Sequence, residues 1–74
     1  MKITGLGYDF ESALSNALDQ AESECRNKYY EYYFKWNIQD LKGSKEAKLN
    51  QETGKLKSDS DVEIEIEIED LLHN

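Results

Sequence analysis

The chain has 74 residues, a formal net charge of −7 and one cysteine, Cys25. A chain of this length forms at most one domain, residues 1–74, and its small core needs a staple or self-association to add stability. One cysteine allows no disulfide within the chain, and no apolar run approaches the roughly 18 residues of a membrane span. The acidic balance disfavours direct nucleic-acid binding, which requires exposed Lys and Arg. We therefore expect a soluble cytoplasmic protein, with a homo-oligomer as one candidate state.

The opening segment, "MKITGLGY", is predicted to form a short first strand that its two glycines weaken or bend. Gly5 and Gly7 lack the third glycine and the following lysine of a phosphate-binding loop. We therefore expect these glycines to let a helix approach the sheet closely.

A helix is predicted to follow over residues 10–27, because apolar residues there recur at three- and four-residue steps. Asp9 can cap its start, and Arg26 and Lys28 suit the negative end of its dipole. The residues expected on its apolar face are Phe10, Ala13, Leu14, Ala17, Leu18, Ala21 and Cys25.

The aromatic segment "YYEYYFKWNIQDL" alternates with period two and predicts a second strand, with Trp36 buried under the helix. The segment "AKLNQETGKLK" predicts the turn of a long basic hairpin tip, residues 43–60, in which Gly43 marks a bulge or bend. The expected core face of the strand carries Tyr30, Tyr32, Phe34, Trp36 and Ile38, and the other face carries Tyr29, Glu31, Tyr33, Lys35, Asn37 and Gln39.

The last strand, "DVEIEIEIED" at residues 61–70, alternates isoleucine with glutamate and is richest in β-branched residues. We expect it at the centre of a three-stranded, antiparallel-type sheet, with the first strand on its far side. The order strand, helix, strand, strand predicts an α+β fold in which the helix packs on one face of the sheet. Residues 71–74, "LLHN", are expected to fray.

The glutamates of the last strand are predicted to lie on the face that the helix leaves uncovered. An acidic row of this kind is ordinarily a solvated surface. Its carboxylates stand about 6.5–7 Å apart, however, which is similar to phosphate spacing, so the row can also enter a basic groove of a partner protein. Exposed tyrosines on this face would anchor such a contact. The predicted partner-binding residues are Glu63, Glu65, Glu67, Glu69, Tyr29, Tyr33 and Glu31.

Catalysis, cofactor binding and metal binding find little support in the sequence. Cys25 continues the apolar helix face, and the only base that could activate it, His73, lies at the chain end. Carboxylates on a straight strand diverge, whereas hard cations require converging oxygens. We therefore expect no enzyme and no catalytic, cofactor or metal site.

The element order, "ALDQAE" within the helix and "GKL" before "VEIEIEI" resemble the dodecins, small flavin-binding proteins that assemble into hollow dodecamers. The resemblance implies an oligomer, with Tyr30 near the family's flavin-stacking tryptophan. In size and acidity the chain is also similar to phage-encoded inhibitors of bacterial defence, such as anti-CRISPR proteins. The leading hypothesis is a non-enzymatic, phage-type inhibitor that docks on a basic protein surface. The alternatives are a dodecin-like oligomer that binds a flavin or another aromatic molecule, and a structural or assembly subunit.

Overall fold

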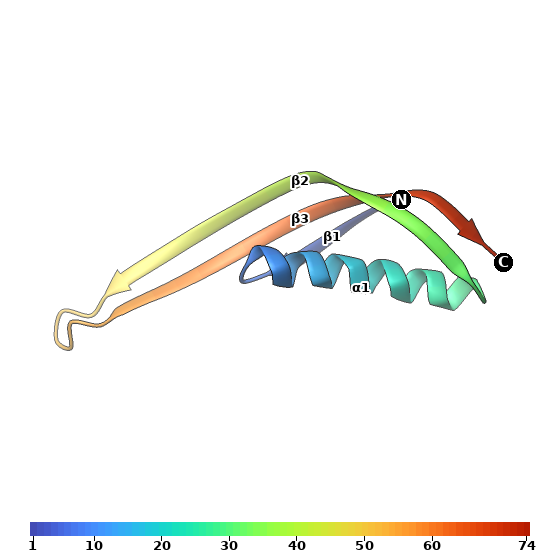
Figure 1. Ribbon diagram of the computed structural model, residues 1–74. Coiled ribbons are helices and arrows are strands. Elements are labelled where there is room, and N and C mark those ends of the chain that lie inside the picture. Colours follow the sequence, from blue (N-terminus) through green and yellow to red (C-terminus); the bar gives the residue numbers. More distant parts are fainter.

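The computed structural model describes residues 1–74. Three strands form one antiparallel sheet in the order β1-β3-β2, and α1 lies on one face of it (Figure 1). The predicted α+β class, the element order and the central position of the last strand are confirmed. The elements are β1 (Lys2–Gly7), α1 (Phe10–Lys28), β2 (Tyr32–Leu49) and β3 (Leu56–His73).

Helix α1 begins and ends at the predicted signals. The Asp9 carboxylate accepts a hydrogen bond of 2.7 Å from the Ser12 N–H, and the Tyr29 N–H donates to the Cys25 carbonyl at 2.8 Å. The buried face of the helix consists of small residues, whereas its leucines are only half-buried. The helix lacks the apolar length needed to cross a membrane. The buried helix residues are Ala13, Ala17, Ala21 and Cys25.

The glycines of β1 lie directly against the helix backbone, as predicted. A Cβ atom built on Gly5 would stand 2.6 Å from the Ala17 nitrogen, and one on Gly7 would stand 2.5 Å from the Ala13 nitrogen. Real carbon atoms do not approach so closely, so any side chain at either glycine would push the helix off the sheet. Glycine on the strand and alanine on the helix together hold the two backbones in contact.

The helix packs over β1 and β3 and leaves the same face of β2 largely open. Trp36 and Ile38 lie opposite Ile68 and Ile66 on the helix side, yet each is 39% exposed. The expected burial of Trp36 is therefore wrong. A helix is about 10 Å across and strands stand about 4.8 Å apart, so a helix seated beside β1 covers two strands and not three. The core residues of the sheet are Ile3, Ile64, Ile66 and Ile68.

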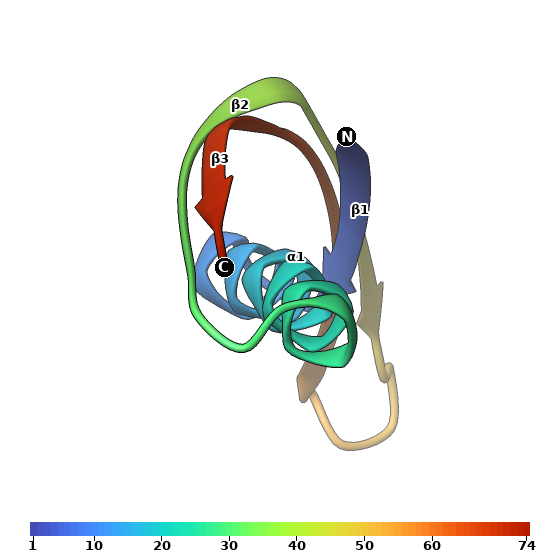
Figure 2. The same ribbon diagram turned by 90° about the vertical axis from the view of Figure 1, so that its right-hand side faces the viewer.

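Two compensating irregularities bend the β2–β3 ladder over the helix (Figures 1 and 2). One extra residue in β3 lies at Asp70, whose φ is +50°, and one in β2 lies at Gln39. The bulge expected at Gly43 is absent, because Gly43 pairs in register with Val62. Each bulge shortens one strand relative to the other, so the register beyond both is restored.

The chain end is ordered, contrary to the expected fraying. Strand β3 continues to His73, and the Asn74 N–H donates to the Glu31 carbonyl at 3.0 Å. The Asn74 carbonyl in turn accepts from the Tyr30 N–H at 3.1 Å. The connection between α1 and β2 supplies these partners, which makes the two segments stabilise each other.

Beyond the ends of β1 and α1, β2 and β3 continue as a two-stranded arm, which comprises residues 44–61 (Figure 1). Every side chain of the arm is exposed except the half-buried Ser60. The turn at its tip is closed by Asn50, whose side chain accepts from the Glu52 N–H at 2.9 Å, and by Gly54 at φ +69°. The arm stretches the molecule to 60 × 20 × 12 Å.

Replacement of Gly5 by alanine should destabilise the fold, because the new methyl group meets the backbone of α1, which cannot move aside alone. Overpacking of this kind costs about 1–3 kcal/mol or more, and a loss of about 2 kcal/mol lowers the melting temperature by about 8–16 °C. Gly43→Ala is the matched control, because its nearest neighbour would lie at 3.5 Å. Thermal melts that show equal effects for the two variants would contradict the close approach.

Replacement of Ile66 by aspartate should unfold the chain, because Ile66 is fully buried and no cation lies nearby to pair with a carboxylate in the core. Ile38→Asp, directly across the ladder, should be much milder because Ile38 is 39% exposed. Circular dichroism of both variants tests the placement of the helix over β3. Equal unfolding by both would show that α1 covers β2 as well.

Candidate functional site

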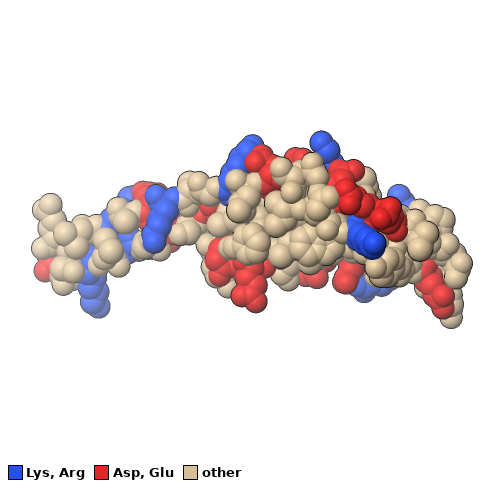
Figure 3. Space-filling view, turned by 45° about the horizontal axis from the view of Figure 1, so that its top comes forward, with Lys and Arg blue, Asp and Glu red and all other residues tan.

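The face of the sheet opposite α1 carries a long row of carboxylates on the central strand. Ile64 and Ile66 point to the helix, so the residues between and beside them point away from it. The ladder register extends the row into the arm, where Asp61 lies opposite Ser44 and Asp59 opposite Glu46. Figure 3 shows acidic side chains over the thicker body, with basic ones among them, and both kinds along the arm. The acidic row consists of Asp59, Asp61, Glu63, Glu65, Glu67 and Glu69.

Cations and donors from the neighbouring strands reach only one end of the acidic row. Lys2 Nζ lies 3.8 Å from Glu65, and the N-terminal amine lies 3.3 Å from Glu67. The Asn37 amide donates to Glu69 at 2.6 Å. These contacts come from the segment of β1 and β2 that flanks the helix-covered part of β3.

The other end of the row, at the base of the arm, forms no ion pair. Lys42 lies opposite Glu63 in the ladder, yet its amine pairs with Asp40 of its own strand at 3.4 Å. Lys48 likewise pairs with Glu46 at 3.1 Å. Asp59, Asp61 and Glu63 consequently have no cation within 4.0 Å.

Glu67 is the most constrained member of the row. Its side chain is 29% exposed, and its Oε2 atom is buried without a hydrogen-bond partner. Its other oxygen accepts from the N-terminal amine at 3.3 Å. Glu67 therefore contributes to the anchoring of β1 more than to the accessible surface.

The structure brings only one of the two predicted tyrosines to this face. Tyr33 lies on β2 opposite Leu72 and is 56% exposed. Tyr29 instead caps the end of α1, and its ring stacks on His73 with centroids 3.9 Å apart. The alternation of "YYEYYF" suggests a strand from Tyr29 onward, but the helix runs to Lys28 and the connection takes up residues 29–31.

Glu31 also lies in this connection and not on β2. Its side chain accepts from the Asn74 amide at 3.3 Å, so it holds the chain end. Tyr30, which the dodecin resemblance places near a flavin, is 94% exposed in the same connection. Neither residue lies beside the acidic row.

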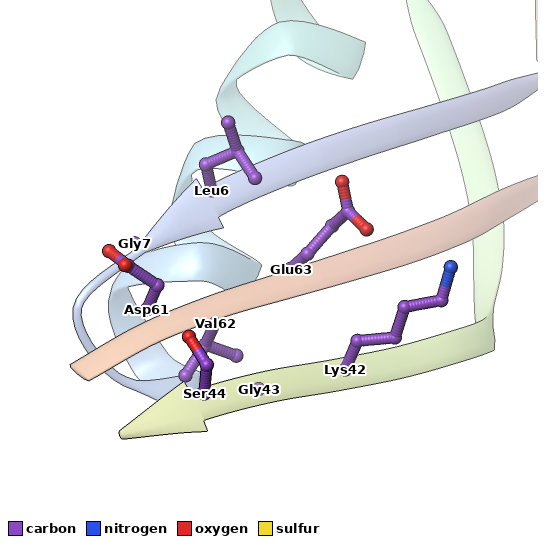
Figure 4. Close-up of a pocket in the computed structure, with 8 residues that line it drawn as sticks. All are labelled: Leu6, Gly7, Lys42, Gly43, Ser44, Asp61, Val62 and Glu63. Carbon is purple, nitrogen blue, oxygen red and sulfur yellow. The ribbon is translucent and has the colours of Figure 1, made fainter. Parts of the chain in front are cut away.

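An open hollow of about 540 Å³ at the base of the arm borders the unpaired end of the row (Figure 4). Gly7 and Gly43 flank Val62 on its two sides, so no side chain fills the space beside it. Leu6, Glu63 and Lys42 project to one side from three adjacent strands (Figure 4). Sequence reasoning missed this hollow, because only the register reveals that two distant glycines share one neighbour.

No three His, Cys, Asp or Glu side chains converge closely enough to hold a metal ion. Comparison with family models, with curated proteins and with solved structures finds no match to this chain. The functional interpretation therefore rests on the geometry of the uncovered sheet face.

Two single substitutions separate the roles within the row. Glu63→Gln should leave the melting temperature unchanged or raise it slightly, because it relieves repulsion from neighbouring carboxylates and breaks no ion pair. Glu67→Gln should lower it by a few degrees, since exposed or partly exposed ion pairs contribute about 0.2–1 kcal/mol. Thermal melts at low and high salt measure both effects. A larger loss for Glu63→Gln than for Glu67→Gln would contradict the pairing described above.

Proposed function

We propose that the chain is a non-enzymatic protein-binding module whose acidic row docks on a basic surface of a partner protein. The observation that supports this function is the unpaired end of the row. Asp59, Asp61 and Glu63 follow one another on one face, and none of them has a cation within 4.0 Å. Carboxylates that no internal lysine neutralises retain their charge for an external partner.

The dimensions of the row suit a groove that normally receives nucleic acid. Its six carboxylates occupy alternate residues from Asp59 to Glu69, at about 6.6 Å intervals and over about 33 Å. A basic groove attracts such a charge row in the same way as a phosphate backbone. A phage-type inhibitor that occupies a nucleic-acid-binding groove is the form of this function that we favour.

Exposed apolar side chains lie at both ends of the row. Tyr33 and Leu72 face each other across β2 and β3 near Glu69, and both are more than half exposed. Leu6 lies beside Glu63 at the other end and is 63% exposed. The charges attract the partner protein, and the apolar side chains beside them then stabilise the complex, because they bury apolar surface in the contact.

A second candidate function is an oligomer that holds an aromatic small molecule. Trp36 favours it, since this residue is 39% exposed beside the open helix-side surface of β2 and could stack on a planar ligand. A yellow protein that light scattering identifies as a dodecamer would support this dodecin-like function. A colourless monomer or dimer would exclude it.

Neutralisation of the unpaired end of the row tests the main proposal. The variant Asp61→Asn/Glu63→Gln should lose partner binding through a slower association rate, and the loss should be greatest at low salt. The control Asp19→Asn/Glu24→Gln removes the same charge from the exposed surface of α1, where neither residue forms an ion pair. Pull-downs from the native host at two salt concentrations measure both variants, with heparin as a competitor for basic grooves.

A row variant that recovers every partner as well as the parent chain would show that the row is only a solvated surface. Equal losses for the row variant and the helix control would show that net charge acts without a defined site. Loss in the row variant alone, with release of the parent's partner by heparin, supports the proposal.

A further inference from the structure

The chain exposes more surface than a compact protein of its size. Its accessible surface is 5752 Å², whereas a compact 8.6 kDa monomer exposes about 4,700 Å². Its radius of gyration is 17.0 Å, against about 11 Å for a compact domain of 74 residues. The excess of about 1,000 Å² matches the scale of the 800 Å² or so that each partner buries in a standard interface.

The two edges of the sheet differ in how they are protected. Side chains of α1 donate to the free edge of β1, where Gln20 reaches the Thr4 carbonyl at 3.0 Å and Asn16 reaches the Leu6 carbonyl at 2.5 Å. The free edge of β2 runs for 18 residues, and no helix or loop packs along it. A long unprotected edge is a template for pairing with another strand.

A partner strand would also stabilise the arm. It is a two-stranded ribbon with exposed side chains, and such a ribbon is marginally stable in water on its own. The arm is nevertheless regular, with an unbroken register from the pair Ser44 and Asp61 to the pair Leu49 and Leu56. A third and a fourth strand beside it would supply the missing support.

The charges along the free edge of β2, in the arm and at its base, are self-complementary. On the face opposite α1, β2 presents charges in the order acidic, basic, neutral, acidic, basic, at Asp40, Lys42, Ser44, Glu46 and Lys48. Residues directly opposite each other in an antiparallel pair share a face. A two-fold axis through Ser44 therefore places Asp40 opposite Lys48 of a second copy, and Lys42 opposite Glu46 of that copy.

Neighbouring registers place like charges together. An axis through Gly43 would set Asp40 against Glu46, and an axis through Lys45 would set Lys42 against Lys48. Like charges directly opposite each other destabilise a strand pair, whereas opposite charges stabilise it. The charge pattern thus selects Ser44 as the centre.

We propose that two copies of this chain pair antiparallel along the β2 edges of their arms, about a two-fold axis at Ser44. The sheet then continues through six strands, and the arms support each other. On the helix side of the sheet, Leu41 of each copy lies opposite Ala47 of the other. This dimer leaves β3 and its acidic row uncovered, so it does not depend on the function proposed above.

Charge reversal at one position of the edge tests the register. Sedimentation or light scattering should give the parent chain twice the mass of the 8.6 kDa monomer. Lys48→Glu should raise the dimer dissociation constant by at least about tenfold, because it sets two like-charged pairs with Asp40 across the axis. The reciprocal variant Asp40→Lys/Lys48→Glu should restore dimerisation, and Lys55→Glu, at the tip, should leave it unchanged. All three positions are exposed, and the new charges at positions 40 and 48 lie opposite Glu65 and Lys57 of the same chain, so the monomer fold is retained.

A cysteine at the axis provides a second, independent readout. Ser44→Cys should form an intermolecular disulfide on oxidation, because residues directly opposite each other in an antiparallel pair have Cα atoms about 4.5–5.5 Å apart, which is within the range of disulfides. Ser58→Cys, on β3 of the arm, should not, and native Cys25 is 2% exposed and unable to compete. A parent chain that stays monomeric at every concentration overturns the proposal. An assembly in which Ser58→Cys cross-links and Ser44→Cys does not also overturns it. Failure of the reciprocal variant to restore dimerisation overturns it as well.

Discussion

The contact between the backbones of β1 and α1 is the constraint on which the rest of the structure depends. Gly5 and Gly7 leave no side chain between the strand and the helix, and Ala13 and Ala17 add only methyl groups. A helix held this close to an edge strand can reach one further strand and no more. Its position therefore determines that β1 and β3 enclose the core and that the helix side of β2 stays open.

The same constraint decides how charge is distributed over the sheet. Because α1 covers one face of β3, the isoleucines of that strand turn towards it and the carboxylates turn away. Only the part of β3 that lies beside β1 gains partners from Lys2 and the N-terminal amine. From Leu6 of β1 outward, the lysines of β2 pair within their own strand, and the row remains unpaired at Asp59, Asp61 and Glu63.

The arm shows a related consequence of a small core. Nine of the 74 residues are buried, and all of them belong to the part of the molecule around α1. The arm adds surface without adding core, so its stability depends on the strand ladder, on the turn at Asn50 and Gly54, and on whatever pairs with its free edge. In the proposed dimer, this partner is the β2 edge of a second copy, and the complementary charges of the two edges leave no charge buried and unpaired.

The sequence by itself determined the elements and their order. Repeats of three and four residues produce α1, alternation of two produces β3, and Asp9 caps the helix because its side chain reaches a free backbone N–H. The closeness of helix and sheet was also foreseeable from Gly5 and Gly7. The placement of the glutamates opposite the core follows from alternation alone, since neighbouring strand residues point to opposite faces.

Only the tertiary structure decided which of those faces is covered and where the register shifts. Trp36 occupies a core position in the alternation of its strand, yet its side chain is 39% exposed because one helix cannot cover three strands. Tyr29 continues an aromatic alternation, yet it stacks on His73, a residue 44 positions away. The irregularities at Gln39 and Asp70, and the ordered end at Asn74, arise from partners on other strands. Local periodicity encodes the direction of a side chain along its own element, but its burial depends on neighbours that only the folded chain brings together.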